Sequence, residues 1–302
     1  MFFVVQNNSS QVSLILKQMN IEITLPDGTI KEYNSPVTGF QVAQDIGSRL
    51  AKDAVCVEIN KELFDTSFVI ENSTSIKIIT TKDIQALPIL RHSSAHLLAQ
   101  AVLNLYPGTE YGVGPDIEDG FYYDFLFENT ISEDDLIEIE NEMKKLSNES
   151  QAFTKSYISK EEAKEAFINQ SFKQELIDSA DSNEGVENSQ VSLYTNNNFV
   201  DLCRGPHVPN TSFIKHFKLT RLGGAYWRGD ESNKQLQRIY GTSWFSKSDL
   251  NQYLNRRLEA EKRDHRKIGR ELNLFTSADE LGPGQFLWKP NGALLRNTIE
   301  SY

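Results

Sequence analysis

The sequence of 302 residues predicts an α+β protein with two folded domains and a connecting helix. Three patterns predict this class. Residues 20–82 combine short strand patterns with one helix, residues 83–246 mix helical and strand-like periodicities, and the run from residue 247 is helical and basic. A chain of this length can bury a separate hydrophobic core in each domain.

Residues 20–82 have the pattern of a ubiquitin-like β-grasp domain. The segment IEITLPDGTIKEY contains two alternating runs around the turn residues 26–28, which predicts a β-hairpin. Residues 40–51 place apolar side chains on one helical face, and strand patterns return in AVCVEI, SFVI and SIKII. This succession of strands around a single helix is what a grasp fold requires.

Residues 1–19 form an atypical extension before this domain. They lack the basic start and the cleavage site of a signal peptide, and Met19 is as suitable a native start as Met1. No stretch reaches the roughly 18 apolar residues of a membrane span. The two cysteines are far apart and form no disulfide framework. We therefore expect a cytoplasmic protein without a membrane partner.

Residues 83–246 predict an α/β domain. The periodicity of ILRHSSAHLLAQAVLNLY predicts a helix that the following Pro-Gly pair ends. A second helix begins near Ser132, which can cap it, with Asp135 in the reciprocal position. The other elements expected are a helix at residues 160–167, a surface loop at residues 179–198 and a strand at FVDLC.

The last part of the chain predicts a linker helix at residues 247–272. Residues 273–302 then begin a further domain, with a new helix starting after the PNG sequence at residues 290–292. We expect this segment to be the start of a truncated domain.

The charge distribution restricts any nucleic-acid contact to a local surface. The formal net charge is −11, from 31 basic and 42 acidic residues. Residues 116–142 contribute eleven carboxylates and no Lys or Arg, so the remainder is near neutral. The run NRRLEAEKRDHRKIGR at residues 255–270 holds seven Lys or Arg against three carboxylates. It is either a solvated helix face rich in ion pairs or a surface that contacts phosphates.

Four side chains form two pairs with the same spacing. His92 and His96 are four residues apart on a predicted helix, so their rings project from the same face. Cys203 and His207 repeat this spacing in a segment whose Arg-Gly-Pro sequence forbids a regular helix. Three imidazoles and a thiol match the ligands that zinc prefers. The metalloprotease interpretation fails because the histidine pair encloses no glutamate, and no glycine-rich phosphate loop is present.

Six sequence blocks around these residues resemble threonyl-tRNA synthetase. They are HSSAHLLAQAV, GPDIEDGFYYDF, FVDLCRGPHVPNT, GGAYWRGD, LQRIYGTSW and KRDHRKIGREL, in the family's order. The resemblance implies a TGS domain at residues 20–82, an editing domain shared with alanyl-tRNA synthetases at residues 83–246, the linker helix, and the first residues of a class II catalytic core.

The resemblance also implies an activity and its residues. In this family the middle domain hydrolyses serine wrongly esterified to threonine tRNA, so we expect the chain to proofread mischarged Ser-tRNA(Thr). Asp201 corresponds to the residue that meets the substrate ammonium, and Lys173 to a lysine near the ester and the attacking water. Catalysis is thus assigned to His92, His96, Lys173, Cys203 and His207, and substrate binding to Tyr123 and Asp201.

The expected cofactors and partners follow from the same resemblance. Editing requires no cofactor and the quartet is expected to hold no metal, although its spacing permits zinc. ATP, Mg and Zn are expected only in the catalytic core that this chain lacks. The partners are tRNA(Thr) and seryl-tRNA, and family members form homodimers through that core. The candidate tRNA contacts are Arg256, Arg257, Lys262, Arg263, Arg266 and Lys267.

Two other functions stay open at this point. The chain can be a module that grips tRNA through its first domain and basic helix, or the quartet can be a structural zinc site without activity. Deacylation of seryl-tRNA distinguishes the enzyme, and metal analysis distinguishes the structural zinc site.

Overall fold

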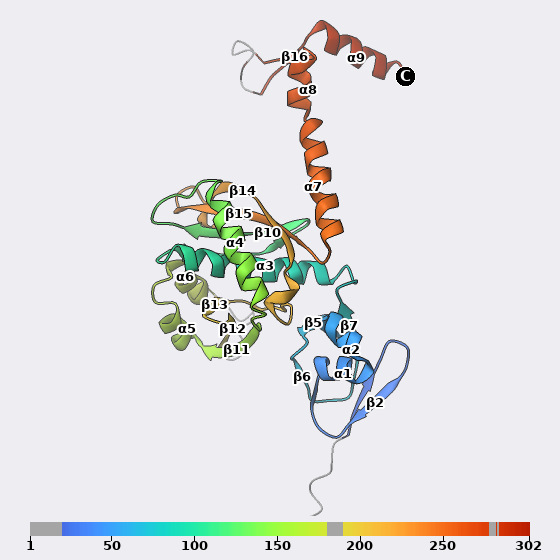
Figure 1. Cartoon of the computed structure of the whole chain (residues 1–302). Coiled ribbons are helices and arrows are strands. Elements are labelled where there is room, and N and C mark those ends of the chain that lie inside the picture. The colour runs from blue at the N-terminus through green and yellow to red at the C-terminus, as the bar shows by residue number, and fades with distance from the viewer. Residues whose placement is uncertain (1–19, 180–189, 278–281, 283) are drawn as a thin grey trace, which may run out of the picture. The chain divides into compact units, whose positions relative to one another are not determined.

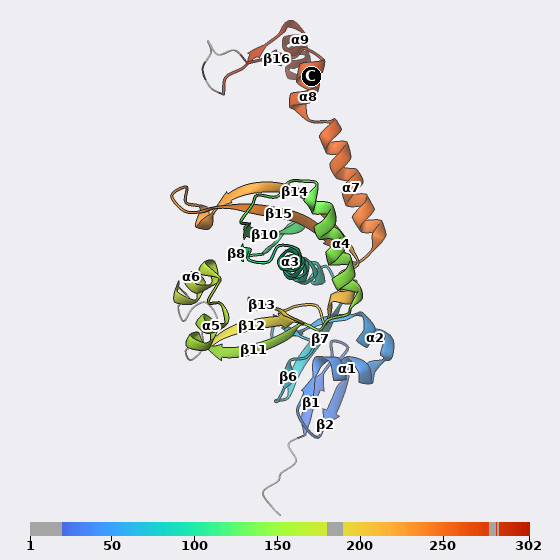
Figure 2. The same ribbon diagram turned by 60° about the vertical axis from the view of Figure 1, so that its left-hand side comes forward.

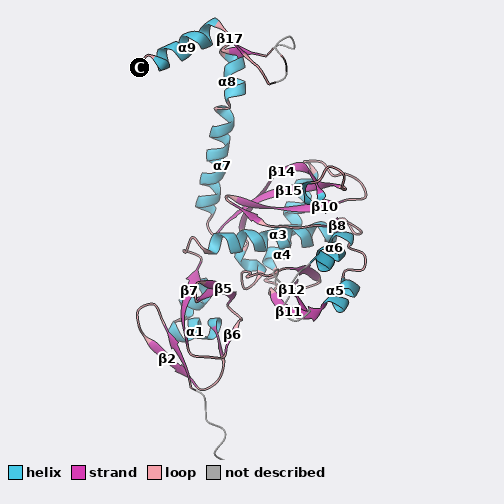
Figure 3. Cartoon of the chain, turned by 180° about the vertical axis from the view of Figure 1, so that it is seen from behind, coloured by secondary structure: helices cyan, strands magenta, loops and turns pink. Residues whose placement is uncertain are grey.

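The computed structural model describes residues 20–179, 190–277, 282 and 284–302. The predicted extension at residues 1–19 lies outside these residues. The chain divides into two compact units, Met1–Ser246 and Lys247–Tyr302 (Figure 1). The first unit contains both predicted domains, and Figure 3 shows helices and strands mixed throughout it, as expected for an α+β fold. None of the helices in the described ranges is long and apolar enough to cross a membrane.

The first domain is built on a mixed sheet with the order β2-β1-β7-β4-β5. Strands β1 and β7 are parallel and the other neighbours are antiparallel, as in a β-grasp fold. The predicted hairpin is present, and its turn is closed by Gly28 at a φ of 83°, which favours glycine. The strands are β1 Ile21–Thr24, β2 Ile30–Tyr33, β3 Val37–Thr38, β4 Ala54–Ile59, β5 Glu62–Asp65, β6 Val69–Ile70 and β7 Thr74–Thr80.

The helix predicted at residues 40–51 is two helices. Helix α1, Gly39–Ile46, begins with a capping box between Thr38 and Gln41, and α2, Ser48–Asp53, follows. The break is at Gly47, whose extended backbone cannot continue a helix. Val42 and Leu50 of the predicted apolar face pack inward, whereas Ile46 is exposed, and the single predicted helix was wrong.

The second domain surrounds one buried helix, α3, Ala86–Leu105. Figure 2 shows α3 between two sheets, one with the order β14-β15-β10-β8 and one with the order β11-β12-β13. Most of its residues are buried, and the buried ones include polar side chains such as His96 and Gln100 as well as apolar ones. The strands are β8 Glu110–Tyr111, β9 Asp116–Ile117, β10 Gly120–Leu126, β11 Thr154–Ser159, β12 Gln190–Asn196, β13 Phe199–Leu202, β14 His216–Tyr226 and β15 Gln235–Trp244.

The surface loop predicted at residues 179–198 is wrong in its second part. Strand β12 covers Gln190–Asn196, while residues 180–189 lie outside the described ranges. In this strand Val191 and Leu193 alternate with polar residues, and their side chains enter the main core. The polar residues on either side of this short alternating run concealed it.

Two further helices of this domain match predicted ones with small shifts, α4 Asp135–Asn148 and α5 Lys160–Ala166. A third is α6 Ser171–Ser179. Ser132 does not reach the backbone of α4; instead its N–H and hydroxyl donate to Asp135 at 2.7 and 2.8 Å. Helix α6 was not predicted, and it carries Lys173.

The second unit begins with two helices where one was predicted. They are α7 Lys247–Lys262 and α8 His265–Glu271, and Asp264 caps the second by accepting from the Arg266 N–H. A two-stranded ribbon, β16 Phe275–Thr276 with β17 Leu287–Trp288, precedes α9 Pro290–Glu300. Helix α9 confirms the helix predicted after the PNG sequence, and proline occupies its first turn.

Candidate functional site

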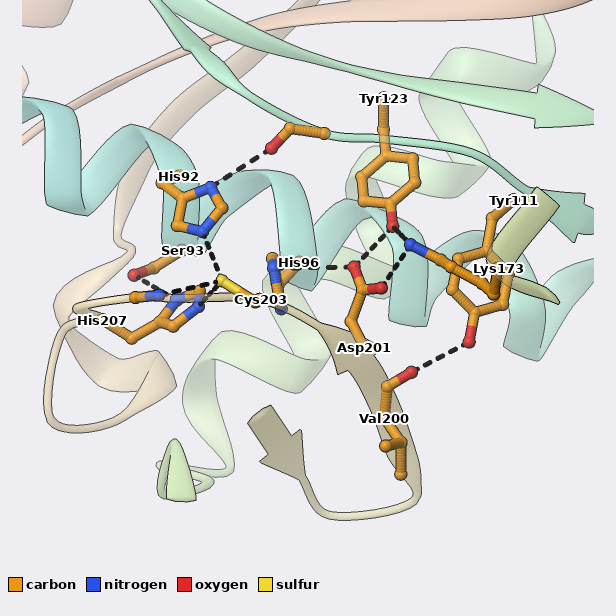
Figure 4. Close-up of polar contacts among 12 residues, drawn as sticks. His92, Ser93, His96, Tyr111, Tyr123, Lys173, Val200, Asp201, Cys203 and His207 are labelled. Carbon is orange, nitrogen blue, oxygen red and sulfur yellow. Dashed lines mark hydrogen bonds and ion pairs between the residues drawn. The ribbon is translucent and has the colours of Figure 1, made fainter. Parts of the chain in front are cut away.

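The structure brings the two predicted His/Cys pairs together. His92 and His96 project from one face of α3, and Cys203 and His207 lie on the loop that follows β13 (Figure 4). One ligand-type atom from each of the four residues lies within 4.8 Å of the others. Sequence spacing predicted each pair, and the packing of β13 against α3 joins them.

Cys203 is at the centre of this group. Its Sγ lies 2.8 Å from His92 Nε2 and 3.3 Å from His207 Nε2, and it accepts from the Gly205 N–H at 3.2 Å. The other nitrogen of His92, Nδ1, lies 3.2 Å from the Gly114 carbonyl oxygen. Because a carbonyl only accepts, Nδ1 carries the proton and Nε2 presents its lone pair. The lone pair of His92 Nε2 therefore faces the Cys203 thiol.

A buried charged group lies beside the quartet. Lys173 from α6 and Asp201 from β13 form an ion pair, and both are almost completely buried, at 1% and 2% exposure. The Tyr123 hydroxyl donates to Asp201 Oδ2 at 2.5 Å and accepts from Lys173 Nζ at 3.1 Å. His96 Nε2 is 3.6 Å from the same carboxylate. The three residues that the resemblance assigned outside the quartet thus form one connected group (Figure 4).

A cavity of about 610 Å³ opens onto this arrangement. Side chains of the quartet, the buried lysine–aspartate pair, backbone and apolar residues all contribute to its wall. Tyr123 and His207 are not among the residues that line it. The polar residues lining the cavity include His92, His96, Asp116, Lys173, Asp201 and Cys203.

Burial keeps the three imidazoles and the thiol of the quartet neutral. It lowers the pKa of His92 below its ordinary value, and it lowers the pKa of His96 and of His207 further, helped by the neighbouring imidazoles. Burial and the charge of Asp201 raise the pKa of the Cys203 thiol to about 12. A protonated thiol surrounded by neutral imidazoles is a poor nucleophile and leaves the imidazoles free to accept protons.

The quartet fits a zinc ion by its chemistry. It offers three imidazole nitrogens and one sulfur, and His96 Nδ1 is buried without a hydrogen-bond partner within the described residues. The second ring nitrogen of His92 contacts the Gly114 carbonyl, and the second ring nitrogen of His207 contacts the Ser93 hydroxyl. Such contacts orient imidazoles that bind metals. His92, His96, Cys203 and His207 would hold the ion.

We nevertheless expect the purified protein to contain far less than one zinc per chain. The thiol would have to lose its proton to bind a metal, and burial raises the pKa of this thiol to about 12. Elemental analysis after purification without added metal measures this, with the Cys203→Ser variant as control. Stoichiometric zinc that disappears together with folding in that variant would instead indicate a structural zinc site.

The predicted tRNA-contact residues belong to the second unit. Several of them are paired with carboxylates of their own helices: Arg257 with Glu261 at 3.8 Å and Lys262 with Glu259 at 2.8 Å. Arg263 and Arg266 pair in the same way with Glu259 and Asp264. Arg256 lies over the Tyr253 ring, and Lys267 lines a small hollow beside Asp264. The pairing favours the solvated-face interpretation without testing tRNA contact.

The sequence analysis missed residues that hold the site together. Gly114 supports His92, the Ser93 hydroxyl lies 3.0 Å from His207 Nδ1, and Tyr111 lies under the ammonium of Lys173. Tyr194 packs its ring 4.4 Å from that of His207. Ser93 lies between the two histidines on a turn of helix and could have been suspected, but the others follow only from tertiary packing.

Comparisons with known proteins identify both domains of the first unit. Residues 21–80 match the TGS domain family, and residues 191–240 match the family described as threonyl and alanyl tRNA synthetase second additional domain. The second match covers β12, β13 and the loop with Cys203 and His207. The fold and site thus define the chain as part of an aminoacyl-tRNA synthetase with an editing-type domain.

Full-length relatives narrow this class. The chain is 49% identical to the threonine–tRNA ligase of Hahella chejuensis over 282 residues, and 49% identical to that of Streptococcus gordonii over 285 residues. Each match covers 93% of this chain and 43% of the relative. The chain corresponds to the N-terminal region of threonine–tRNA ligases. It spans less than half the length of these relatives.

Proposed function

We propose that the second domain hydrolyses serine from wrongly charged Ser-tRNA(Thr). The observation that carries this proposal is the cavity, whose wall combines a lone-pair-bearing imidazole with a buried lysine–aspartate pair. Such a combination supplies a base, a positive charge and an ammonium-binding carboxylate within one pocket. The similarity to threonine–tRNA ligases supports an aminoacyl ester of tRNA(Thr) as the substrate of this pocket.

The need for such a site follows from binding energetics. Serine lacks one methyl group of threonine, and a missing methyl is worth only about 1–3 kcal/mol of discrimination in a pocket. A synthetic site therefore cannot exclude serine adequately. A second site can admit the seryl group and exclude the larger threonyl group, so that it removes only the wrong product.

The proposed reaction uses water as the nucleophile. His92 takes a proton from water, and the water oxygen attacks the ester carbonyl carbon to form a tetrahedral oxyanion. The Lys173 ammonium stabilises this oxyanion. When the intermediate collapses, the ester C–O bond breaks, the ribose hydroxyl of tRNA leaves with the proton from His92, and serine is released. A zinc ion in the quartet, when bound, would lower the pKa of bound water.

Asp201 would recognise the amino group of the substrate. Its carboxylate is held by Tyr123 and Lys173 at the cavity wall, where a substrate ammonium can join the ion pair. Cys203 has no role as a nucleophile in this scheme, because its thiol is protonated and water can attack an ester directly.

We expect the chain to deacylate Ser-tRNA(Thr) roughly 10- to 200-fold faster than Thr-tRNA(Thr), the range that one methyl group allows. The measurement is the release of radiolabelled amino acid from each charged tRNA at equal protein concentration, against buffer alone. If seryl-tRNA is as long-lived with the protein as in buffer, the chain is a tRNA-binding module or a disabled site, and the proposal is wrong.

A further inference from the structure

The TGS domain contributes a side chain to the surroundings of the hydrolytic site. Strand β5, Glu62–Asp65, is an edge strand of the grasp sheet, paired only with β4 among the described strands. Its last residue, Asp65, is half-buried and points into the editing-type domain of the same unit. A cavity of about 1010 Å³ lies at this junction, and both Asp65 and His207 line it.

The two carboxylate oxygens of Asp65 have separate partners in the second domain. Oδ1 accepts from the backbone N–H of His207 at 2.9 Å. Oδ2 accepts from the hydroxyl of Tyr194 at 2.5 Å. A carboxylate that accepts one bond on each oxygen fixes both donors relative to each other, and hydrogen bonds to a charged acceptor are the stronger kind.

Both partners of Asp65 determine where the imidazole of His207 lies. The N–H belongs to His207 itself, and the Tyr194 ring packs 4.4 Å from the imidazole. The hydroxyl of Tyr194 also lies against Gly205, where an added Cβ would be only 1.9 Å from that oxygen. His207 in turn contacts Cys203 Sγ at 3.3 Å, and Cys203 contacts the base His92 at 2.8 Å.

Other contacts of this loop come from the editing-type domain. Ser192 bonds the Cys203 carbonyl at 2.7 Å, Lys155 bonds the Arg204 carbonyl at 2.7 Å, and Ser93 accepts from the Val208 N–H at 3.0 Å. These contacts hold the two ends of the loop. The imidazole of His207 is contacted by the Ser93 hydroxyl at 3.0 Å and by the stacked ring of Phe153, whereas its backbone N–H is held by Asp65 from the other domain.

We propose that Asp65 is a positioning residue of the hydrolytic site, through which the TGS domain holds His207, and with it Cys203 and His92, in the catalytic arrangement. The inference rests on the proposed hydrolytic function. It gives the TGS domain a part in the rate of ester hydrolysis, separate from any contact with tRNA.

The test compares Asp65→Ala with Asp65→Asn in the full chain. Alanine removes both acceptors, whereas asparagine has the same shape: its Oδ1 can accept from His207, and its amide can donate to the Tyr194 oxygen. Glu62→Ala is the matched control, since it removes a carboxylate from the same strand at an exposed position. The kcat and KM for Ser-tRNA(Thr) deacylation and the hydrogen exchange of residues 203–208 are measured for each variant.

The expected result is a loss of kcat of roughly 10- to 100-fold in Asp65→Ala, because misplacing a catalytic group by about 1 Å can cost on the order of a hundredfold. KM should change little, exchange at residues 203–208 should rise while that of α3 does not, and Asp65→Asn should recover most of the rate. Wild-type kcat in Asp65→Ala, or an equal loss in Glu62→Ala, would overturn the inference.

The deacylation rate of the wild-type chain separates this inference from the proposed function. If the wild-type chain hydrolyses no seryl-tRNA, the proposed function fails, and the role of Asp65 in hydrolysis fails with it. If the wild type is active and Asp65→Ala loosens residues 203–208 without lowering kcat, only the positioning inference is wrong.

Discussion

Replacing Lys173 with alanine is expected to lower the free energy of unfolding by about 3–5 kcal/mol at neutral pH. The reason is the burial of its partner: Asp201 is 2% exposed, and without the ammonium its carboxylate would be an uncompensated charge in the interior. This differs from the expectation for a surface lysine, whose replacement would leave the fold intact. Chemical denaturation followed by circular dichroism measures the change.

A double substitution provides the control for Lys173. Lys173→Met with Asp201→Asn removes both charges, keeps an acceptor for the Tyr123 hydroxyl, and should recover most of the lost stability. Both Lys173→Ala and the double variant should lack deacylation, because the oxyanion-stabilising charge is missing. If Lys173→Ala unfolds at the wild-type denaturant concentration, the pair is not a buried ion pair in solution.

Replacing His92 with alanine is expected to lower kcat for Ser-tRNA(Thr) deacylation by about 10²–10⁴-fold, the usual contribution of a general base. The KM should change little, since His92 would act on water and not on the amino acid. Single-turnover deacylation at saturating protein measures the chemical step directly. His92 is partly exposed to the cavity, so the variant should fold.

His265→Ala is the matched control for His92. His265 is exposed on α8 in the second unit, where its side chain is 83% accessible. The His265→Ala variant should deacylate Ser-tRNA(Thr) at the wild-type rate. A His92→Ala variant that retains a tenth or more of the wild-type kcat would exclude His92 as the base and direct attention to His96.

The sequence predicted the parts of the site that lie within one segment of the chain, but not the contacts that tertiary packing makes between segments. The spacing of His92 and His96 follows from helix geometry, and a proline before His207 requires a loop. The burial of Lys173 was not predictable, because its short helix is amphipathic and its partner Asp201 lies on a strand formed 28 residues later. Resemblance, not spacing, identified Lys173, Tyr123 and Asp201.

The errors in the fold have local physical causes. One glycine divides the helix of the grasp domain, and one aspartate that caps a new helix divides the linker. Periodicity continues through both breaks, so a pattern of apolar residues cannot reveal them. Strand β12 was missed because alternation over a few residues is a weak signal beside a polar segment.

The burial of most of α3 has a consequence for how the site can fail. A helix enclosed by two sheets exchanges its amide hydrogens only when the domain opens globally, so it belongs to the slowest-exchanging core. The histidines on α3 therefore cannot leave the site by local unfolding. Heating should therefore abolish hydrolysis and tertiary structure in one cooperative step. A destabilising substitution far from the cavity would reduce the quantity of folded protein, while the turnover of each folded molecule would stay unchanged.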